Sequence, residues 1–174
     1  EALKVLGSEG LLELLPNRGA RVSRLTAAEV DEMFPVMGAL EGLAGEIACQ
    51  RISDDGIDEI RALHYQMAAH HKRREFSEYF GLNQQIHENI MAATGNATLA
   101  IMYASLAARI RMARYRANFS QSRWDQAMAE HDEILSALTE RDGPRLTRVL
   151  SAHLKNTCET VKKVIFNSDA EEAP

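Results

Sequence analysis

The sequence has no apolar run near 18 residues, the length that a membrane-spanning helix needs. It contains only two cysteines, Cys49 and Cys158, and their spacing is that of neither a metal motif nor a disulfide framework. Aromatic residues make up 6% of the chain and the net charge is −5, so most of its surface is not suited to nucleic acid. The first residues, EALKVLGSEG, do not resemble a secretory signal. We therefore expect a cytoplasmic protein with reduced cysteines.

The 174 residues are rich in Ala, Leu, Met, Arg and Glu, a composition that favours helices. From Thr26 onward apolar residues recur at helical spacing, and we find no strand pattern. Thr26 and Glu29 form a capping box that opens the first of six amphipathic helices. The other expected boundaries are marked by Ser53, Ser77, Thr94, Asn96, Ser122 and Pro144. The pattern predicts an all-α, six-helix antiparallel bundle over residues 25–168, with a disordered tail at 169–174.

Residues 1–24 follow a different pattern. Residues 1–8 look like the end of a helix, and two short apolar runs follow at Leu11–Leu15 and Ala20–Val22. The PNRG segment between them has strong turn chemistry. This predicts a helix end and a β-hairpin with arginine at its tip, which is too small to fold alone. We therefore expect the chain to start inside a larger unit.

Three of the predicted helices each carry a histidine in the middle of an apolar face. His87 lies in LNQQIHENIM with Asn83 one turn earlier on the same face, because positions four apart in a helix are neighbours. His131 and His153 occupy equivalent places on the fifth and sixth helices. If these faces meet in one core, three imidazoles and an amide oxygen converge.

A single histidine on an apolar face is more often a hydrogen-bonded core residue than a metal ligand. Three on separate helices favour a divalent metal site, because a buried imidazole must be hydrogen-bonded or metal-bound. Imidazole ligands suit Zn²⁺ or Ni²⁺ better than Mg²⁺ or Ca²⁺. Since the set formed by Asn83, His87, His131 and His153 is neutral, a bound metal would attract an anion.

The fourth predicted helix offers candidate contacts for that anion. Arg109 and Arg116 lie seven residues apart on one side, and a guanidinium suits a carboxylate. Tyr103 is a candidate lining residue. Arg111 and Arg114 are expected to face outward. For each arginine the competing interpretation is a solvated side chain or a surface ion pair.

These segments resemble a known family, the GntR superfamily of bacterial transcription regulators, FadR subfamily, with an effector domain of the FCD type. EALKVLGSEGLLELLPNRGARV resembles the end of its winged helix-turn-helix. LNQQIHENIMAATGN, EHDEILSAL and SAHLKNT resemble the three segments that carry its metal ligands, an Asp and three His. The six-helix count resembles the VanR-like subgroup. The chain departs from the family at Asn83, where the usual residue is Asp, and at Met37, where the usual residue is Arg.

The resemblance implies a ligand-responsive regulator that works as a homodimer. It implies that the helical domain binds a divalent metal and a small carboxylate metabolite, while the N-terminal domain binds operator DNA through Asn17, Arg18 and Arg21. Two alternatives remain. His131-Asp132 is typical of metal-dependent HD phosphohydrolases, but adjacent helical residues diverge by about 100°, which points Asp132 away from the histidine face. A helical bundle without a ligand is the second alternative, and it leaves three buried histidines unexplained.

Overall fold

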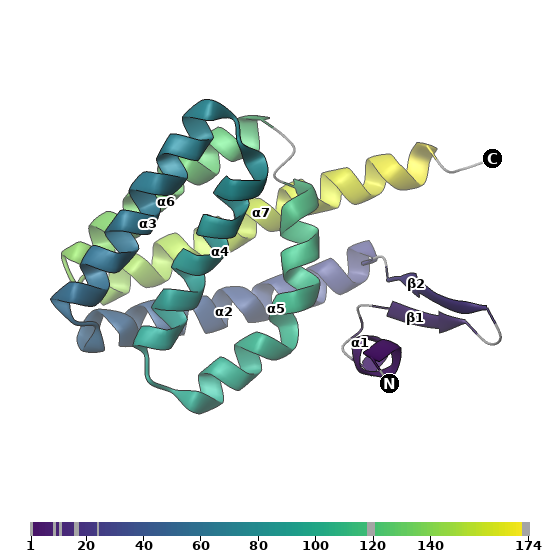
Figure 1. Ribbon diagram of the computed structural model, residues 1–174, viewed down its shortest axis with the longest axis horizontal. Helices are drawn as coiled ribbons and strands as arrows, with labels where there is room; N and C mark the ends of the chain where they lie inside the picture. Colours follow the sequence, from purple (N-terminus) through teal and green to yellow (C-terminus); the bar gives the residue numbers. More distant parts are fainter. Residues whose placement is uncertain are drawn as a thin grey trace.

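The computed structural model describes residues 2–8, 10, 12–15, 18–23, 25–117 and 121–171. The elements, in chain order, are α1 (Ala2–Ser8), β1 (Leu12–Leu15), β2 (Gly19–Val22), α2 (Ala27–Arg51), α3 (Asp54–Arg73), α4 (Phe76–Ala93), α5 (Ala97–Ala117), α6 (Gln121–Thr139) and α7 (Gly143–Glu171). Helices α2 to α7 form one bundle, and α1 with the hairpin lies at one end of it (Figure 1). The predicted fold class, an all-α bundle preceded by a helix end and a β-hairpin, is confirmed.

Local hydrogen bonds begin the helices where the sequence predicts. Thr26 Oγ1 accepts from the backbone N–H of Glu29 at 3.2 Å, and the Glu29 carboxylate accepts from the backbone N–H of Thr26 at 2.9 Å. Ser53 Oγ accepts from the N–H of Gly56, and Asn96 Oδ1 accepts from the N–H of Leu99, each at 3.1 Å. These side chains satisfy backbone donors that have no partner within the helix, so they fix where α2, α3 and α5 begin.

Helix α2 packs most extensively against α7, and the two run side by side through the bundle (Figure 1). Gly38, Gly42 and Gly45 of α2 face α7, which lets the two backbones approach closely. The Thr147 hydroxyl of α7 donates to the Gly42 carbonyl at 2.9 Å. Helix α7 continues to Glu171, into the first residues of the expected tail, and residues 172–174 lie outside the described part.

The N-terminal hairpin pairs β1 with β2 antiparallel, with Leu12 opposite Val22 and Leu15 opposite Gly19. Gly19 has a φ of 86°, a left-handed conformation that glycine adopts without strain. Arg21 is paired across the strands with Glu13 at 2.7 Å. The hairpin is therefore a short ribbon of the kind expected for a wing.

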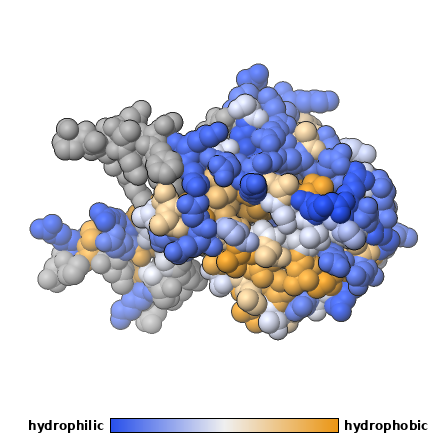
Figure 2. Space-filling view, turned by 180° about the vertical axis from the view of Figure 1, so that it is seen from behind, coloured by the Kyte–Doolittle hydropathy of each residue, from blue (hydrophilic) through white to orange (hydrophobic). Residues whose placement is uncertain are grey.

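Polar side chains cover most of the face seen in Figure 2, but an apolar area interrupts them on the helical domain. The large apolar side chains that remain exposed on α2 and α5 are Val36, Leu43, Ile101, Met102 and Tyr115. Among the described residues, no helix combines the length and apolar character needed to cross a membrane.

Candidate metal centre

His87 of α4, His131 of α6 and His153 of α7 meet in the interior of the bundle. Their ring centroids lie 5.0 to 5.2 Å apart, and one nitrogen from each ring lies within 4.8 Å of the others. Each residue is at most 3% exposed, and the neighbouring Asn83 is 1% exposed. The structure thus brings together all four residues that the sequence proposes as ligands.

Arg114 of α5 lies at the centre of this group. Its Nη2 is 2.8 Å from His87 Nε2, 3.2 Å from His153 Nε2 and 3.2 Å from Asn83 Oδ1. The residue is 3% exposed, so the expectation that Arg114 faces outward is wrong. The reason is positional: Arg114 follows Ile110 by four residues and Tyr103 by eleven, which places it on their buried face.

The hydrogen-bond partners determine which ring nitrogen carries the proton. A guanidinium can only donate, so the Nε2 atoms of His87 and His153 must present lone pairs to Arg114. His131 Nε2 lies 3.1 Å from Asn83 Nδ2, which also can only donate. Reversing the Asn83 amide would place its NH₂ group against Arg114, donor against donor. Three Nε2 lone pairs therefore face one interior region.

Carboxylates lie behind two of the rings. Glu130 Oε2 accepts from His153 Nδ1 at 2.7 Å. Glu41 Oε2 lies 3.0 Å from His87 Nδ1, close enough for its negative charge to favour the tautomer that carries the proton on Nδ1. His131 Nδ1 has no hydrogen-bond partner among the described residues. A carboxylate on the far nitrogen fixes the ring orientation and makes Nε2 a better metal ligand, so the donor set fits a divalent cation.

Arg123 is a second buried guanidinium beside the histidines, and it was not singled out in the sequence. Its Nη2 donates to Glu130 Oε2 at 2.8 Å and to Thr157 Oγ1 at 2.9 Å, and the residue is 2% exposed. Asn156 Nδ2 donates to the other Glu130 oxygen at 2.7 Å. Glu130 is thereby held in place to receive His153. The sequence signal is that Arg123 precedes the buried Trp124 and lies four residues before the buried Ala127.

Burial keeps the three imidazoles neutral. Desolvation is the main cause that lowers the pKa values of His131 and His153 well below their usual range, and the charge of Arg114 lowers both further. Desolvation also lowers the pKa of His87, although Glu41 opposes it. Burial would raise the pKa of Glu41, but His87 and Arg114 outweigh that effect and the net shift is downward. Neutral imidazole is the form that binds metal.

The three residues predicted to bind an effector do not form one group among the described residues. Tyr103 is 6% exposed on the buried side of α5, and burial raises the pKa of its hydroxyl, so it stays a neutral phenol. Arg109 is paired with Glu29 at the start of α2 and is not brought to the histidines. The Arg116 side chain lies outside the described part. The structure therefore adds Arg114 as the guanidinium at the site and leaves the three predicted roles as predictions.

Two of the residues predicted to contact DNA, Arg18 and Arg21, belong to the described part of the hairpin region. Arg18 is exposed next to β2, and Arg21 is exposed on β2 with Glu13 as its partner. Asn17 lies outside the described residues.

The arrangement at Asp132 bears on the hydrolase alternative. Its carboxylate is 64% exposed and lies 2.9 Å from His64 Nε2, away from the three-histidine group. As helical geometry predicts, Asp132 diverges from the adjacent His131. The hydrolase interpretation is therefore not favoured.

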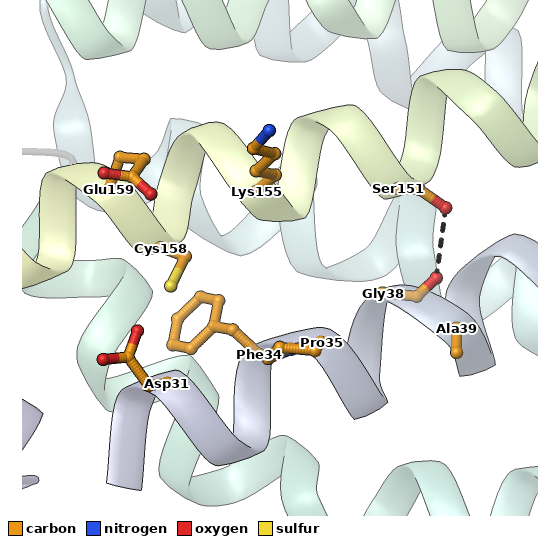
Figure 3. A pocket seen from close by; sticks show the side chains of 9 residues that line it. All are labelled: Asp31, Phe34, Pro35, Gly38, Ala39, Ser151, Lys155, Cys158 and Glu159. Carbon is orange, nitrogen blue, oxygen red and sulfur yellow. Dashed lines mark hydrogen bonds between the residues drawn. The ribbon is translucent and has the colours of Figure 1, made fainter. Parts of the chain in front are cut away.

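A separate groove of about 510 Å³ lies between α2 and α7 (Figure 3). Phe34, Pro35 and Cys158 form much of its apolar lining, and Asp31, Lys155 and Glu159 supply charged groups. The Ser151 hydroxyl donates to the Gly38 carbonyl at 3.4 Å within it. None of the clustered histidines lines this groove, so it is distinct from the candidate metal centre.

The chain thus combines a six-helix bundle that holds three clustered, buried histidines with a β-hairpin that precedes it. Residues 32–156 match the family model described as FCD domain. The chain therefore belongs to the FCD-domain family of transcriptional regulators, within the GntR superfamily that its sequence resembles.

Similar proteins agree with this assignment. The HTH-type transcriptional repressor RspR of Escherichia coli K12 is 24% identical over 165 residues, covering 94% of this chain and 72% of RspR. The HTH-type transcriptional regulator YdhC of Bacillus subtilis is 25% identical over 166 residues, covering 95% and 74% of the two chains. The solved structure of E. coli McbR/YncC superposes with a TM-score of 0.85 at 16% identity, covering 93% of this chain and 82% of that one, which shows the shared fold.

Proposed function

We propose that this regulator senses a small carboxylate metabolite through a divalent metal ion held by His87, His131 and His153, with Asn83 as a fourth ligand. The observation that carries the proposal is the convergence of three Nε2 lone pairs, with carboxylates behind two of the rings. Imidazole ligands favour Zn²⁺ or Ni²⁺.

The charge balance at the site supports an anionic effector. The four proposed ligands are neutral, and the carboxylates of Glu41, which is buried, and Glu130, which is partly buried, are balanced by Arg114 and Arg123. A divalent cation added to this group leaves a positive charge in a buried setting. A carboxylate at an open metal position would reduce that charge. The sequence predicts Tyr103, Arg109 and Arg116 as its contacts, and Arg109 would have to leave its pair with Glu29 to reach it.

The DNA-binding part of the proposal rests on the hairpin and the relatives. An HTH-type regulator that acts as a homodimer matches a palindromic operator through its own two-fold symmetry. Asn17, Arg18 and Arg21 would contact phosphate or the minor groove, contacts that position the protein but do not read sequence. An effector that prefers one arrangement of the helical domains would change the spacing of the DNA-binding heads.

Metal analysis of purified protein tests the site directly. We expect about one equivalent of Zn²⁺ or Ni²⁺ per chain, and a lower melting temperature after chelation, because a ligand that binds only the folded state stabilises it. His87→Ala should lose most of the metal. His71→Ala is the matched control, since His71 is paired with Asp125 outside the cluster. Full metal content in His87→Ala would remove His87 from the site.

A thermal-shift screen of small mono- and dicarboxylates tests the effector. We expect stabilisation by one class of acid when metal is present and little after chelation. If an acid stabilises the metal-free protein to the same extent, effector binding does not require the metal.

A further inference from the structure

Arg114 is not one of the four predicted metal ligands, yet its guanidinium lies among them. Its Nη2 carries two hydrogens, yet three acceptors surround it within 3.2 Å, namely His87 Nε2, His153 Nε2 and Asn83 Oδ1. With three acceptors and two hydrogens, Nη2 must share its hydrogens among the acceptors in bifurcated hydrogen bonds, and its charge lies between them. A metal ion at this site would require the same three atoms.

We propose that the Arg114 guanidinium is an internal competitor of the metal, occupying its place and covering the lone pairs that would bind it. The inference rests on the proposed metal site and adds how that site is regulated. Arg114 and the metal exclude each other because each Nε2 has one lone pair, and because two cations at one centre repel each other. Metal binding must therefore expel the guanidinium from the cluster.

Asn83 supplies the hydrogen-bond donor that faces the third imidazole. Its Nδ2 donates to His131 Nε2 at 3.1 Å while its Oδ1 accepts from Arg114 at 3.2 Å. All three Nε2 lone pairs thus face protein donors: two face Arg114 Nη2, which shares its two hydrogens with Asn83 Oδ1 as well, and one faces the Asn83 amide. An ionised aspartate at position 83 could accept from Arg114 but could not donate to His131. The amide is therefore the group at this position that closes the cluster without a metal.

Glu41 allows the guanidinium to leave without becoming an isolated charge. Its Oε1 lies 3.4 Å from Arg114 Nη1, on the opposite nitrogen from the one that faces the histidines. Glu41 is 3% exposed and belongs to α2, whereas Arg114 comes from α5. The pair can persist when Nη2 gives up its imidazole contacts. Expelling Arg114 would change how α5 meets α2 and α4, which couples metal loading to helix packing.

Metal titration of chelator-treated protein tests the competition. We expect Arg114→Met to bind Co²⁺ or Zn²⁺ about ten- to hundredfold more tightly than the unmodified protein, the range associated with losing a charge-assisted hydrogen bond. Arg111→Met is the matched control: Arg111 lies on the same helix and pairs with Glu88 at the surface, so its metal affinity should not change. The Co²⁺ absorption spectrum reports whether nitrogen ligands bind in each variant.

The outcomes separate the two proposals. Metal binding by the unmodified protein with no gain in Arg114→Met overturns the competition and leaves the metal site intact. No binding by either protein overturns both. Binding only by Arg114→Met supports the competition and shows that Arg114 keeps the site closed.

A double variant and a spectroscopic measurement on the unmodified protein test the proposal even if Arg114→Met alone does not fold. Arg114→Met leaves Glu41 as an unpaired buried charge, so Arg114→Met with Glu41→Gln keeps the core neutral, and we expect the same gain in affinity. In ¹⁵N-arginine spectra of the unmodified protein, a protected guanidinium signal should disappear on adding Zn²⁺ and be missing from Arg114→Met. Persistence of the Arg114 signal at full metal occupancy would contradict the proposal.

Discussion

At the scale of single residues, the buried neutral histidines make the stability of the metal-free protein depend on pH. The folded-state pKa values of His87, His131 and His153 lie below their usual values, so between the two values the unfolded chain binds more protons than the folded one. Stability is then unaffected above about pH 6.5 and is lost as pH falls below it, by up to about 1.4 kcal/mol per pH unit for each histidine. Urea unfolding in chelator at pH 7.5, 6.5 and 5.5 measures this. A free energy of unfolding that stays constant across the range would mean that these imidazoles titrate alike in both states.

The same residues show what the sequence could predict of the site. His87, His131 and His153 were found because a polar side chain interrupts an apolar helical face, a pattern visible within each helix. Arg114 was missed although its spacing from Ile110 is equally visible, because an arginine is usually exposed and its buried partner Glu41 lies 73 positions away. Pairing across helices depends on how the helices pack, which periodicity within one helix does not report.

At the scale of helices, boundaries were predictable and packing was not. Thr26, Ser53 and Asn96 mark the ends correctly because a cap is satisfied within three residues of itself. The close approach of α2 and α7 depends on glycines whose neighbours lie about a hundred positions later in the chain. A glycine in a helix has no local signal that separates a packing role from an incidental one.

Gly45→Ala tests the packing of α2 on α7. An added Cβ would lie 2.7 Å from Leu150 Cδ1 and 2.9 Å from Leu146 Cγ, closer than atoms tolerate. We expect the free energy of unfolding to fall by about 1–2 kcal/mol, because the cost of overpacking exceeds the helical preference of alanine. Gly81→Ala in α4 is the control: nothing lies within 4 Å of its added Cβ, so it should gain about 0.5–1 kcal/mol. Equal gains from both substitutions would show that the α2–α7 contact yields without strain.

At the scale of the whole molecule, the exposed apolar side chains of α2 bear on the proposed homodimer. Val36 is 48% exposed and Leu43 is 47% exposed, and their spacing of seven residues puts them on one side of the helix. The face in Figure 2 shows an apolar area among polar side chains. Contiguous exposed apolar surface is typical of protein interfaces. We therefore expect the α2 face to contact a second copy of the chain.

Leu43→Lys tests that expectation by sedimentation equilibrium. Burying an uncompensated ammonium group in an interface is costly, so the dimer should dissociate at least about tenfold more readily. Tyr65→Lys is the matched control, because Tyr65 is a large apolar residue that is 63% exposed on α3. The melting temperatures of the two variants should be similar at concentrations where both are monomeric, since neither side chain is buried in the bundle. If the Leu43→Lys dimer is as tight as that of the unmodified protein, the dimer interface does not include this face of α2. Because α2 also carries Glu41 at the cluster and packs on α7, an interface on this helix would place the partner subunit one helix away from the candidate metal centre.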